Sequence, residues 1–172
     1  EVDRKQPPQE DWELQTMKPF LKGEGVDVGC GSNKWPDTAI GVDITPTGEI
    51  GRAGSQITTA SVADITASAD NLPFPDMAMD YVKARHLLEH IVDPIPAIYE
   101  WVRVLKIGGY LAIACPDEEV IDGVPLDPSH KHAFTVQSCI RLVHASVGVG
   151  TMEIEVTAKD EISFVVVMRR VA

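Results

Sequence analysis

Two short apolar segments, Val26–Gly29 and Ala39–Asp43, are separated by a glycine-containing stretch that is too short for a full helix. Each segment has the length and composition of a short buried strand. Gly29 and Gly31 stand at the end of the first segment, and glycine permits positive φ and a close approach to the backbone. The pattern therefore predicts two neighbouring strands joined by a tight loop, with a shortened or missing first helix.

Further strands and two helices are expected along the rest of the chain. Apolar residues at steps of three and four after Pro94 indicate an amphipathic helix, which Gly108-Gly109 is expected to stop. Thr135 is a suitable N-cap for a second helix that ends at Gly148. The remaining apolar segments predict strands at 64–69, 79–86, 110–116, 152–158 and 162–170.

Strands that alternate with helices predict an α/β fold, a Rossmann-like doubly wound sheet with mostly parallel strands. Residues 159–161 are too few for a crossover, so the last two strands should form an antiparallel hairpin. The 172 residues suit one domain. By composition, we expect residues 1–22 to be a loose N-terminal arm, residues 23–172 to be the domain, and residues 44–62 to hold a loop with one weak helix.

Charge and cysteine usage narrow the classes of partner and location. The formal net charge of −11 argues against an electrostatic grip on nucleic acid or anionic lipid. No apolar stretch approaches the ~18 residues that span a membrane, and the charged N-terminus is atypical of a secretory signal. Cys30, Cys115 and Cys139 form no C-x-x-C motif, as expected for buried thiols in a reducing, cytoplasmic protein. The sequence leaves the oligomeric state open.

The glycine loop and the acid that follows it suit a nucleoside ligand. Ligands of open parallel sheets bind beyond the carboxyl ends of the strands, and Asp43 can accept two hydrogen bonds from a ribose diol. The G-x-G-x-x-G fingerprint of dinucleotide-binding sites is absent, because Lys34 stands at the position of its third glycine. Asp43 also follows Gly29 by only fourteen residues, whereas the acid of that fingerprint follows by about 20. No phosphate-binding loop motif occurs either, so a nucleoside without phosphates is favoured. Alternatively, the glycines only make a tight turn and Asp43 only caps a strand.

Several segments resemble class I S-adenosylmethionine-dependent methyltransferases of the small-molecule, type 11-like branch. They are VDVGCGSN, DNLPFPDMAMDYVKARHLLEHIVDP, EWVRVLKIGGYLAIACPD and DPSHKHAFT, which occur in the family's order between residues 24 and 136. The resemblance implies a seven-stranded sheet, S-adenosylmethionine as the cofactor, and transfer of its methyl group to a small-molecule acceptor. A non-catalytic nucleoside-binding module or a degenerate partner subunit is the alternative.

The same resemblance assigns roles around the methionine and ribose of the cofactor. Asp27 would orient the methionine amine, directly or through water. The backbone of Gly29, Cys30 and Gly31 would face the methionine and ribose portions. Asp43 would accept the ribose hydroxyls.

On the adenine side, Ala69 and Asp70 would lie near the base, with Leu72 packing close by. The acid that often contacts the adenine amino group aligns with Ser68 in this sequence. Either Asp70 or Asp64 replaces it, or no residue does.

Among the five histidines, His86 has the best position for a substrate or catalytic role, at the mouth of the fourth strand. Its structural alternative is a strand-end histidine that bonds the backbone. The neighbouring Arg85 either binds an anionic acceptor or pairs with the acids after the fifth strand. His130 and His132 lie downstream of Asp117, Glu118 and Glu119, but no full ligand set is visible, so no metal is expected.

The loops after the fourth and fifth strands, Arg85–Asp93 and Pro116–Phe134, should set acceptor specificity together with residues 1–22. The second of these loops carries five acids, Asp117, Glu118, Glu119, Asp122 and Asp127. Such a lining favours a polar or cationic acceptor over a phosphorylated one.

Overall fold

A computed structural model describes residues 11–50 and 59–172 of the chain, and these residues form one twisted seven-stranded sheet. The strand order is β3-β2-β1-β4-β5-β7-β6. The first five strands in this order are parallel, and β7 runs antiparallel to both β5 and β6. The strands are β1 (Gly25–Val28), β2 (Ile40–Asp43), β3 (Ile65–Thr66), β4 (Met79–Arg85), β5 (Leu105–Pro116), β6 (Met152–Lys159) and β7 (Ser163–Arg170).

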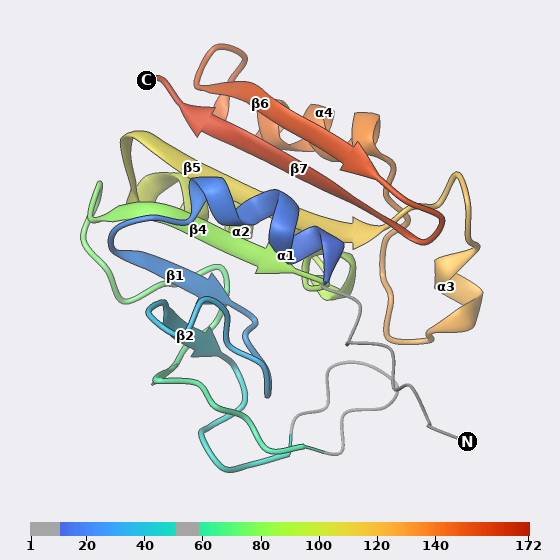
Figure 1. Cartoon of the computed structure of the whole chain (residues 1–172), viewed down its shortest axis with the longest axis horizontal. Helices are drawn as coiled ribbons and strands as arrows, with labels where there is room; N and C mark the ends of the chain where they lie inside the picture. The colour runs from blue at the N-terminus through green and yellow to red at the C-terminus, as the bar shows by residue number, and fades with distance from the viewer. Residues whose placement is uncertain (1–10, 51–58) are drawn as a thin grey trace, which may run out of the picture.

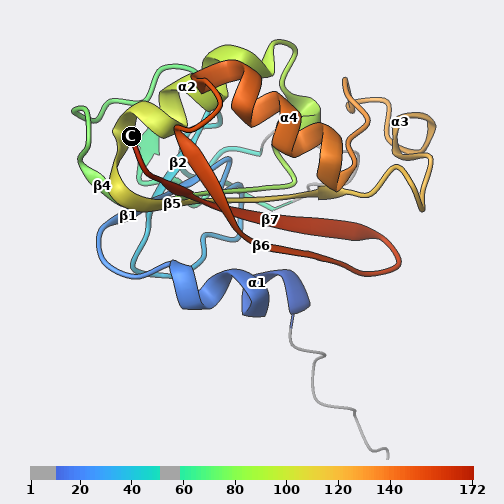
Figure 2. The same cartoon turned by 90° about the horizontal axis from the view of Figure 1, so that it is seen from above.

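Helices cover both faces of the sheet. On one face lie α2 (Pro94–Val104) and α4 (Val136–Val147), and α1 (Trp12–Met17) lies on the other face, as Figure 2 shows. The remaining helical segments are η1 (Lys18–Phe20), η2 (Leu88–His90) and α3 (Gly123–Leu126). The predicted α/β class, the parallel sheet and the terminal hairpin are all confirmed.

Side chains of successive strand residues point to opposite faces, and this alternation divides the core in two. In β7, Phe164 and Val166 pack on the side of α2 and α4, whereas Val165 and Val167 pack on the side of α1. The parallel strands β1, β4 and β5 end at the side of the molecule where α3 lies (Figure 1). Ligand sites of such sheets form at this edge.

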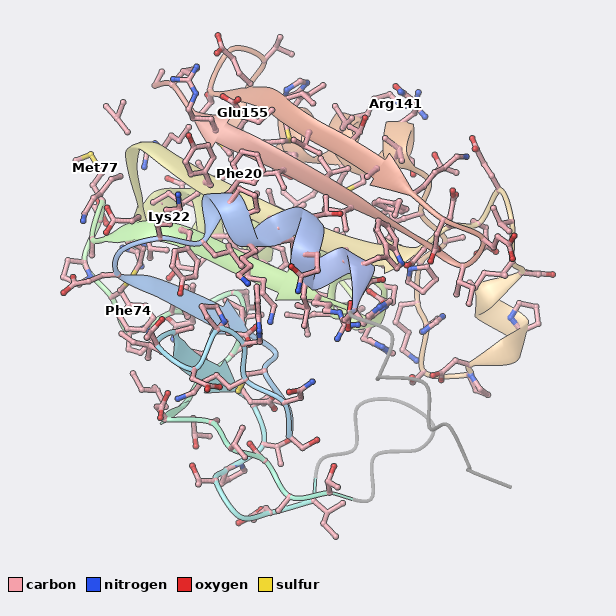
Figure 3. All side chains as sticks on the ribbon, in the orientation of Figure 1. Phe20, Lys22, Phe74, Met77, Arg141 and Glu155 are labelled. Carbon is pink, nitrogen blue, oxygen red and sulfur yellow. The ribbon has the colours of Figure 1, made fainter. Side chains whose placement is uncertain are left out.

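The prediction that residues 1–22 are a loose arm is wrong for residues 12–20, which are helical. The Asp11 side chain caps α1 by accepting from the amide of Leu14 (3.3 Å). Leu14 and Met17 are buried, and Phe20, labelled in Figure 3, packs edge-on against Tyr110 of β5. Apolar residues in the segment thus attach it to the sheet. Residues 1–10 lie outside the described residues, and the domain boundary at residue 22 stays a prediction.

Two other boundaries differ from the predicted ones. The helix α2 ends at Val104, and β5 continues directly through Gly108-Gly109 instead of starting after the pair. A Cβ atom on Gly109 would lie 2.9 Å from the carbonyl oxygen of Asp80, so glycine permits β5 to approach β4 closely there. The weak helix predicted within 44–62 is absent from 44–50 and 59–62, and residues 51–58 lie outside the described residues.

Candidate functional site

The loop after β1 turns through two glycines with positive φ, Gly29 (+69°) and Gly31 (+51°). The amides of Gly29 and Cys30 donate to the carbonyl of Val42 (2.7 and 3.2 Å), which joins the loop to β2. A Cβ atom on Gly29 would collide with Leu87 at 2.8 Å, whereas one on Gly31 would meet nothing within 4 Å. Glycine at position 29 therefore permits the close packing of Leu87 against the loop, whereas Gly31 exposes its backbone to open space at the end of the strand.

Asp43 lies beside this turn, as the sequence predicts. Its Oδ2 accepts from the amide of Gly31 (2.9 Å), and its Oδ1 accepts from the amide of Thr45 (2.8 Å). These bonds fix the direction of the carboxylate. Each oxygen of a carboxylate has a further lone pair, so Asp43 can still accept from two hydroxyl groups of a ligand.

A buried ion pair lies beneath the loop. Asp27 of β1 and Lys83 of β4 are direct partners in the parallel register, and Lys83 Nζ lies 2.7 Å from Asp27 Oδ2. Asp27 also accepts from the amide of Trp35 (2.8 Å), and Lys83 donates to the carbonyl of Trp35 (2.9 Å). Burial raises the pKa of Asp27 and lowers the pKa of Lys83, and the attraction within the pair opposes both shifts. The pair thus holds the Trp35 end of the loop, and the role of Asp27 toward the methionine amine stays a prediction.

The segment after β3 is anchored by a tryptophan of α2. The indole Nε1 of Trp101 donates to the carbonyl of Ala69 (3.0 Å). The exposed Asp70 accepts a hydrogen bond from the hydroxyl of Ser68. Ala69 and Asp70 are therefore held in a defined position, and their contact with adenine stays a prediction.

Two other residues considered for the adenine side have structural partners. Leu72 is 3% exposed and belongs to the core, and its packing close to the adenine stays a prediction. Asp64 accepts from Lys34 Nζ (2.8 Å) and from the amide of Gly41 (2.7 Å), so it ties the loop after β1 to β2.

His86 follows β4 in a left-handed backbone conformation (φ +50°), which is uncommon for a residue other than glycine. Its Nε2 lies 3.1 Å from Oε1 of Glu13 in α1. The buried Glu13 also accepts from Arg85 Nε (2.5 Å) and from the hydroxyl of Ser163. Arg85 also lies 2.5 Å from Asp11, so it pairs with N-terminal acids instead of the acids after the fifth strand, and its binding of an anionic acceptor stays a prediction.

Glu13 and His86 shift each other's pKa. Burial alone would raise the pKa of Glu13, but the bonds and charges of His86, Ser163 and Arg85 outweigh it and lower this pKa to about 2. Burial alone would lower the pKa of His86, but the carboxylates of Glu13 and Glu89 outweigh it and raise this pKa to about 9. His86 is therefore protonated at neutral pH and has no lone pair for base catalysis. Any contact of His86 with a substrate stays a prediction.

This pair should make the protein less stable in alkali. The folded-state pKa of His86 is raised, so its contribution is complete below pH about 6.5 and is lost as the pH rises through about 9. Because the His86 side chain is 38% exposed, solvent screening reduces the loss to the order of 1 kcal/mol. Urea unfolding at about pH 6.5 and about pH 9.5 measures it.

The matched variants are Glu13→Gln, which removes the charge that faces His86, and Glu161→Gln, which removes an exposed charge from the β6–β7 turn. Glu13→Gln should reduce the difference between the two pH values, and Glu161→Gln should keep it. An equal pH dependence in wild type and Glu13→Gln would contradict the ion pair.

Acids of the loop after β5 are partly neutralised. Lys159 Nζ lies 2.7 Å from Glu119 and 3.3 Å from Asp117, which is fully buried. His132 Nε2 bonds the carbonyl of Val92 (3.1 Å). The described loop is therefore less negative than its five acids suggest, which weakens the predicted preference for a cationic acceptor.

Three charged residues of the site were not identified from the sequence as partners. Glu13 lies in the segment predicted to be an arm, Lys83 lies within the predicted strand 79–86, and Glu89 lies in the loop expected to set acceptor specificity. The available signal for Lys83 was its place between the apolar Val82 and Ala84 within a predicted strand, because a buried charge requires a partner.

A family model described as "Methyltransferase domain" matches residues 26–113. An uncharacterized methyltransferase of Schizosaccharomyces pombe is 34% identical over 71 residues, which are 41% of this chain and 25% of the relative. Demethylmenaquinone methyltransferase of Listeria monocytogenes is 30% identical over 130 residues, which are 65% of this chain and 54% of the relative. The chain thus spans about half, or less, of the length of these curated relatives.

Solved structures show the same fold. A SAM-dependent methyltransferase from Thermotoga maritima superimposes with a TM-score of 0.68 at 22% identity, covering 93% of this chain and 88% of that chain. A SAM-dependent methyltransferase from Archaeoglobus fulgidus gives a TM-score of 0.68 at 16% identity, covering 92% of each chain. No helix within residues 11–50 and 59–172 is long and apolar enough to cross a membrane.

Proposed function

The chain belongs to the methyltransferase domain family, whose methyl donor is S-adenosylmethionine, and we propose that it transfers this methyl group to a small polar acceptor. One observation carries the proposal. The Gly31 amide and the Asp43 carboxylate are bonded to each other at adjacent strand ends, with open space in front of Gly31. An exposed backbone turn beside an oriented carboxylate is what a nucleoside with a free ribose diol requires.

Methyl transfer from a sulfonium is a direct displacement. The acceptor's oxygen or nitrogen forms a bond to the methyl carbon, the carbon–sulfur bond breaks, and its electron pair stays on sulfur. The acceptor then loses a proton. Alignment and exclusion of water supply most of the rate enhancement, so a general base among the protein side chains is not essential. The protonated state of His86 is compatible with such a reaction.

We place the acceptor at the ends of β4 and β5, between Arg85–Asp93 and Pro116–Phe134, near His86. A cytoplasmic location is part of the proposal, since all three cysteines are unpaired and buried. Labelled S-adenosylmethionine with a mixed library of metabolites, RNA and phosphorylated sugars tests the acceptor class. Labelling of RNA or of phosphorylated sugars in preference to neutral and cationic metabolites would contradict the small polar acceptor.

Replacing Asp43 by alanine should weaken binding of S-adenosylhomocysteine ten- to hundredfold, because hydrogen bonds to a charged group contribute about 1.5–3 kcal/mol. Isothermal titration calorimetry measures the affinity, and circular dichroism checks the fold. The exposed Asp37 lies in the same β1–β2 connection, so Asp37→Ala is the matched control and should bind as wild type does. An unchanged affinity in folded Asp43→Ala would show that Asp43 only caps the turn.

A non-catalytic binding module is the second candidate. It is favoured by the connection between β1 and β2, all of which is described and contains no helix, and by the ion pair that occupies His86. Binding of S-adenosylhomocysteine without turnover of any acceptor would support this candidate over the enzyme.

A further inference from the structure

Three side chains with metal-ligating atoms meet just beyond the end of β4. Glu89 and His90 lie in η2, and His130 lies in the loop that precedes α4. Their ligand atoms all lie within 4.8 Å of one another. His90 Nε2 is 4.0 Å from Glu89 Oε1, and the rings of His90 and His130 meet edge to face with their centroids 4.8 Å apart.

The Glu89 carboxylate is the second observation that points to a ligand. Glu89 is 2% exposed, and neither of its oxygens has a hydrogen-bond partner in the described part of the chain. His86 Nδ1 is 3.5 Å from Oε1, and the Cys115 thiol also lies close, but neither makes a well-formed bond to the carboxylate. A buried carboxylate whose oxygens accept no hydrogen bond is costly, and this points to a further ligand on Glu89 besides the His86 ring.

A chain of hydrogen bonds fixes the tautomer of His90. The hydroxyl of Ser129 donates to Asp127 Oδ1 (2.7 Å), so its oxygen accepts from His90 Nδ1–H at 3.1 Å. The Nε2 atom of His90 then carries the lone pair and lies toward Glu89. Outer-shell bonds of this kind orient the histidine ligands of metal sites.

The backbone holds the two segments together. The carbonyl of Glu89 accepts from the amides of Lys131 (2.7 Å) and His132 (3.2 Å). These bonds place His130 against η2, and they use the main chain of Glu89 while leaving its carboxylate available. The ring of His132 is bonded to Val92 and lies outside the cluster.

We propose that Glu89, His90 and His130 bind one divalent transition-metal ion such as Zn²⁺. Two imidazoles with one carboxylate suit such ions, whereas Mg²⁺ and Ca²⁺ prefer oxygen ligands. Metal–ligand bonds of about 2.0–2.2 Å require ligand atoms roughly 3–3.5 Å apart, so side-chain shifts of about 1 Å or less would close the site. Three protein ligands leave at least one position open. The proposal does not depend on methyl transfer.

Metal binding itself is the test. Protein stripped with EDTA should bind about one equivalent of Zn²⁺ in calorimetry, and excess Mg²⁺ should not compete. Co²⁺ should give visible absorption of nitrogen and oxygen ligation without the charge-transfer band of a thiolate. No binding of Zn²⁺, or a thiolate band from the buried cysteines, would overturn the proposal.

Variants of the proposed ligands, compared with a variant of the neighbouring His132, test whether the metal binds at this cluster. Glu89→Gln keeps the shape of the side chain and removes its charge, and His130→Ala removes a ring from the loop. Each should weaken Zn²⁺ binding at least about tenfold, and the matched control His132→Ala should bind as wild type does. Thermal melting confirms that each variant is folded. Wild-type affinity in either folded cluster variant, or an equal loss in His132→Ala, would place the metal elsewhere.

Discussion

Replacing Lys83 by methionine should lower the free energy of unfolding by about 3–5 kcal/mol, because it leaves the carboxylate of Asp27 buried without its cation. Asp27 is 1% exposed and Lys83 is 2% exposed, so water cannot replace either partner. The substitution also removes the bond from Lys83 Nζ to the carbonyl of Trp35. Urea unfolding followed by circular dichroism measures the loss.

The pH dependence of this variant identifies the cause. Without Lys83, burial raises the folded-state pKa of Asp27 further above its unfolded value. Folding then takes up a proton, so the destabilisation should shrink as the pH falls. The double variant Asp27→Asn, Lys83→Met should recover part of the stability, since no buried charge remains. A loss below about 1 kcal/mol in Lys83→Met would contradict a tight buried pair.

Replacing Trp101 by alanine should also lower the free energy of unfolding by about 3–5 kcal/mol, because it removes the fully buried indole with which α2 packs into the core. Thermal or urea unfolding measures this loss. Trp101→Phe keeps most of the packing and removes only the bond from Nε1 to the carbonyl of Ala69, so it should cost much less.

The Trp101→Phe variant also tests whether the Ala69 segment, which Trp101 holds, belongs to the proposed cofactor site. If Ala69 lies against adenine, release of its carbonyl should weaken binding of S-adenosylhomocysteine in a protein that remains folded. The variant Tyr99→Phe alters an exposed aromatic residue on the same helix and is the matched control. Equal affinities in wild type and Trp101→Phe would separate the Ala69 segment from the cofactor site.

Local features of the chain could be predicted because they depend on near neighbours. The apolar spacing after Pro94 indicated α2, and Thr135 and Gly148 indicated the ends of α4, where Thr135 and Ser138 form a capping box. The proximity of Gly31 and Asp43 was also predictable, since consecutive parallel strands end at the same edge of a sheet.

The partners of the charged residues could not be predicted in this way. Lys83 meets Asp27 because β4 pairs with β1 in one register, and a shift by one residue would turn its side chain to the other face. His130 meets Glu89 and His90, whereas His132 lies outside this cluster, because two main-chain bonds set the position of the loop against η2.

The sequence by itself determined the α/β class, both ends of α4 and the edge of the sheet at which a ligand can bind, because periodicity, capping and strand direction are local properties. Only the tertiary structure decided that Glu13 binds His86 and raises its pKa, and that Glu89 faces two histidines. These contacts join residues far apart in the chain, and their existence depends on how α1 and the loop after β5 dock on the sheet. No spacing within one segment specifies that docking.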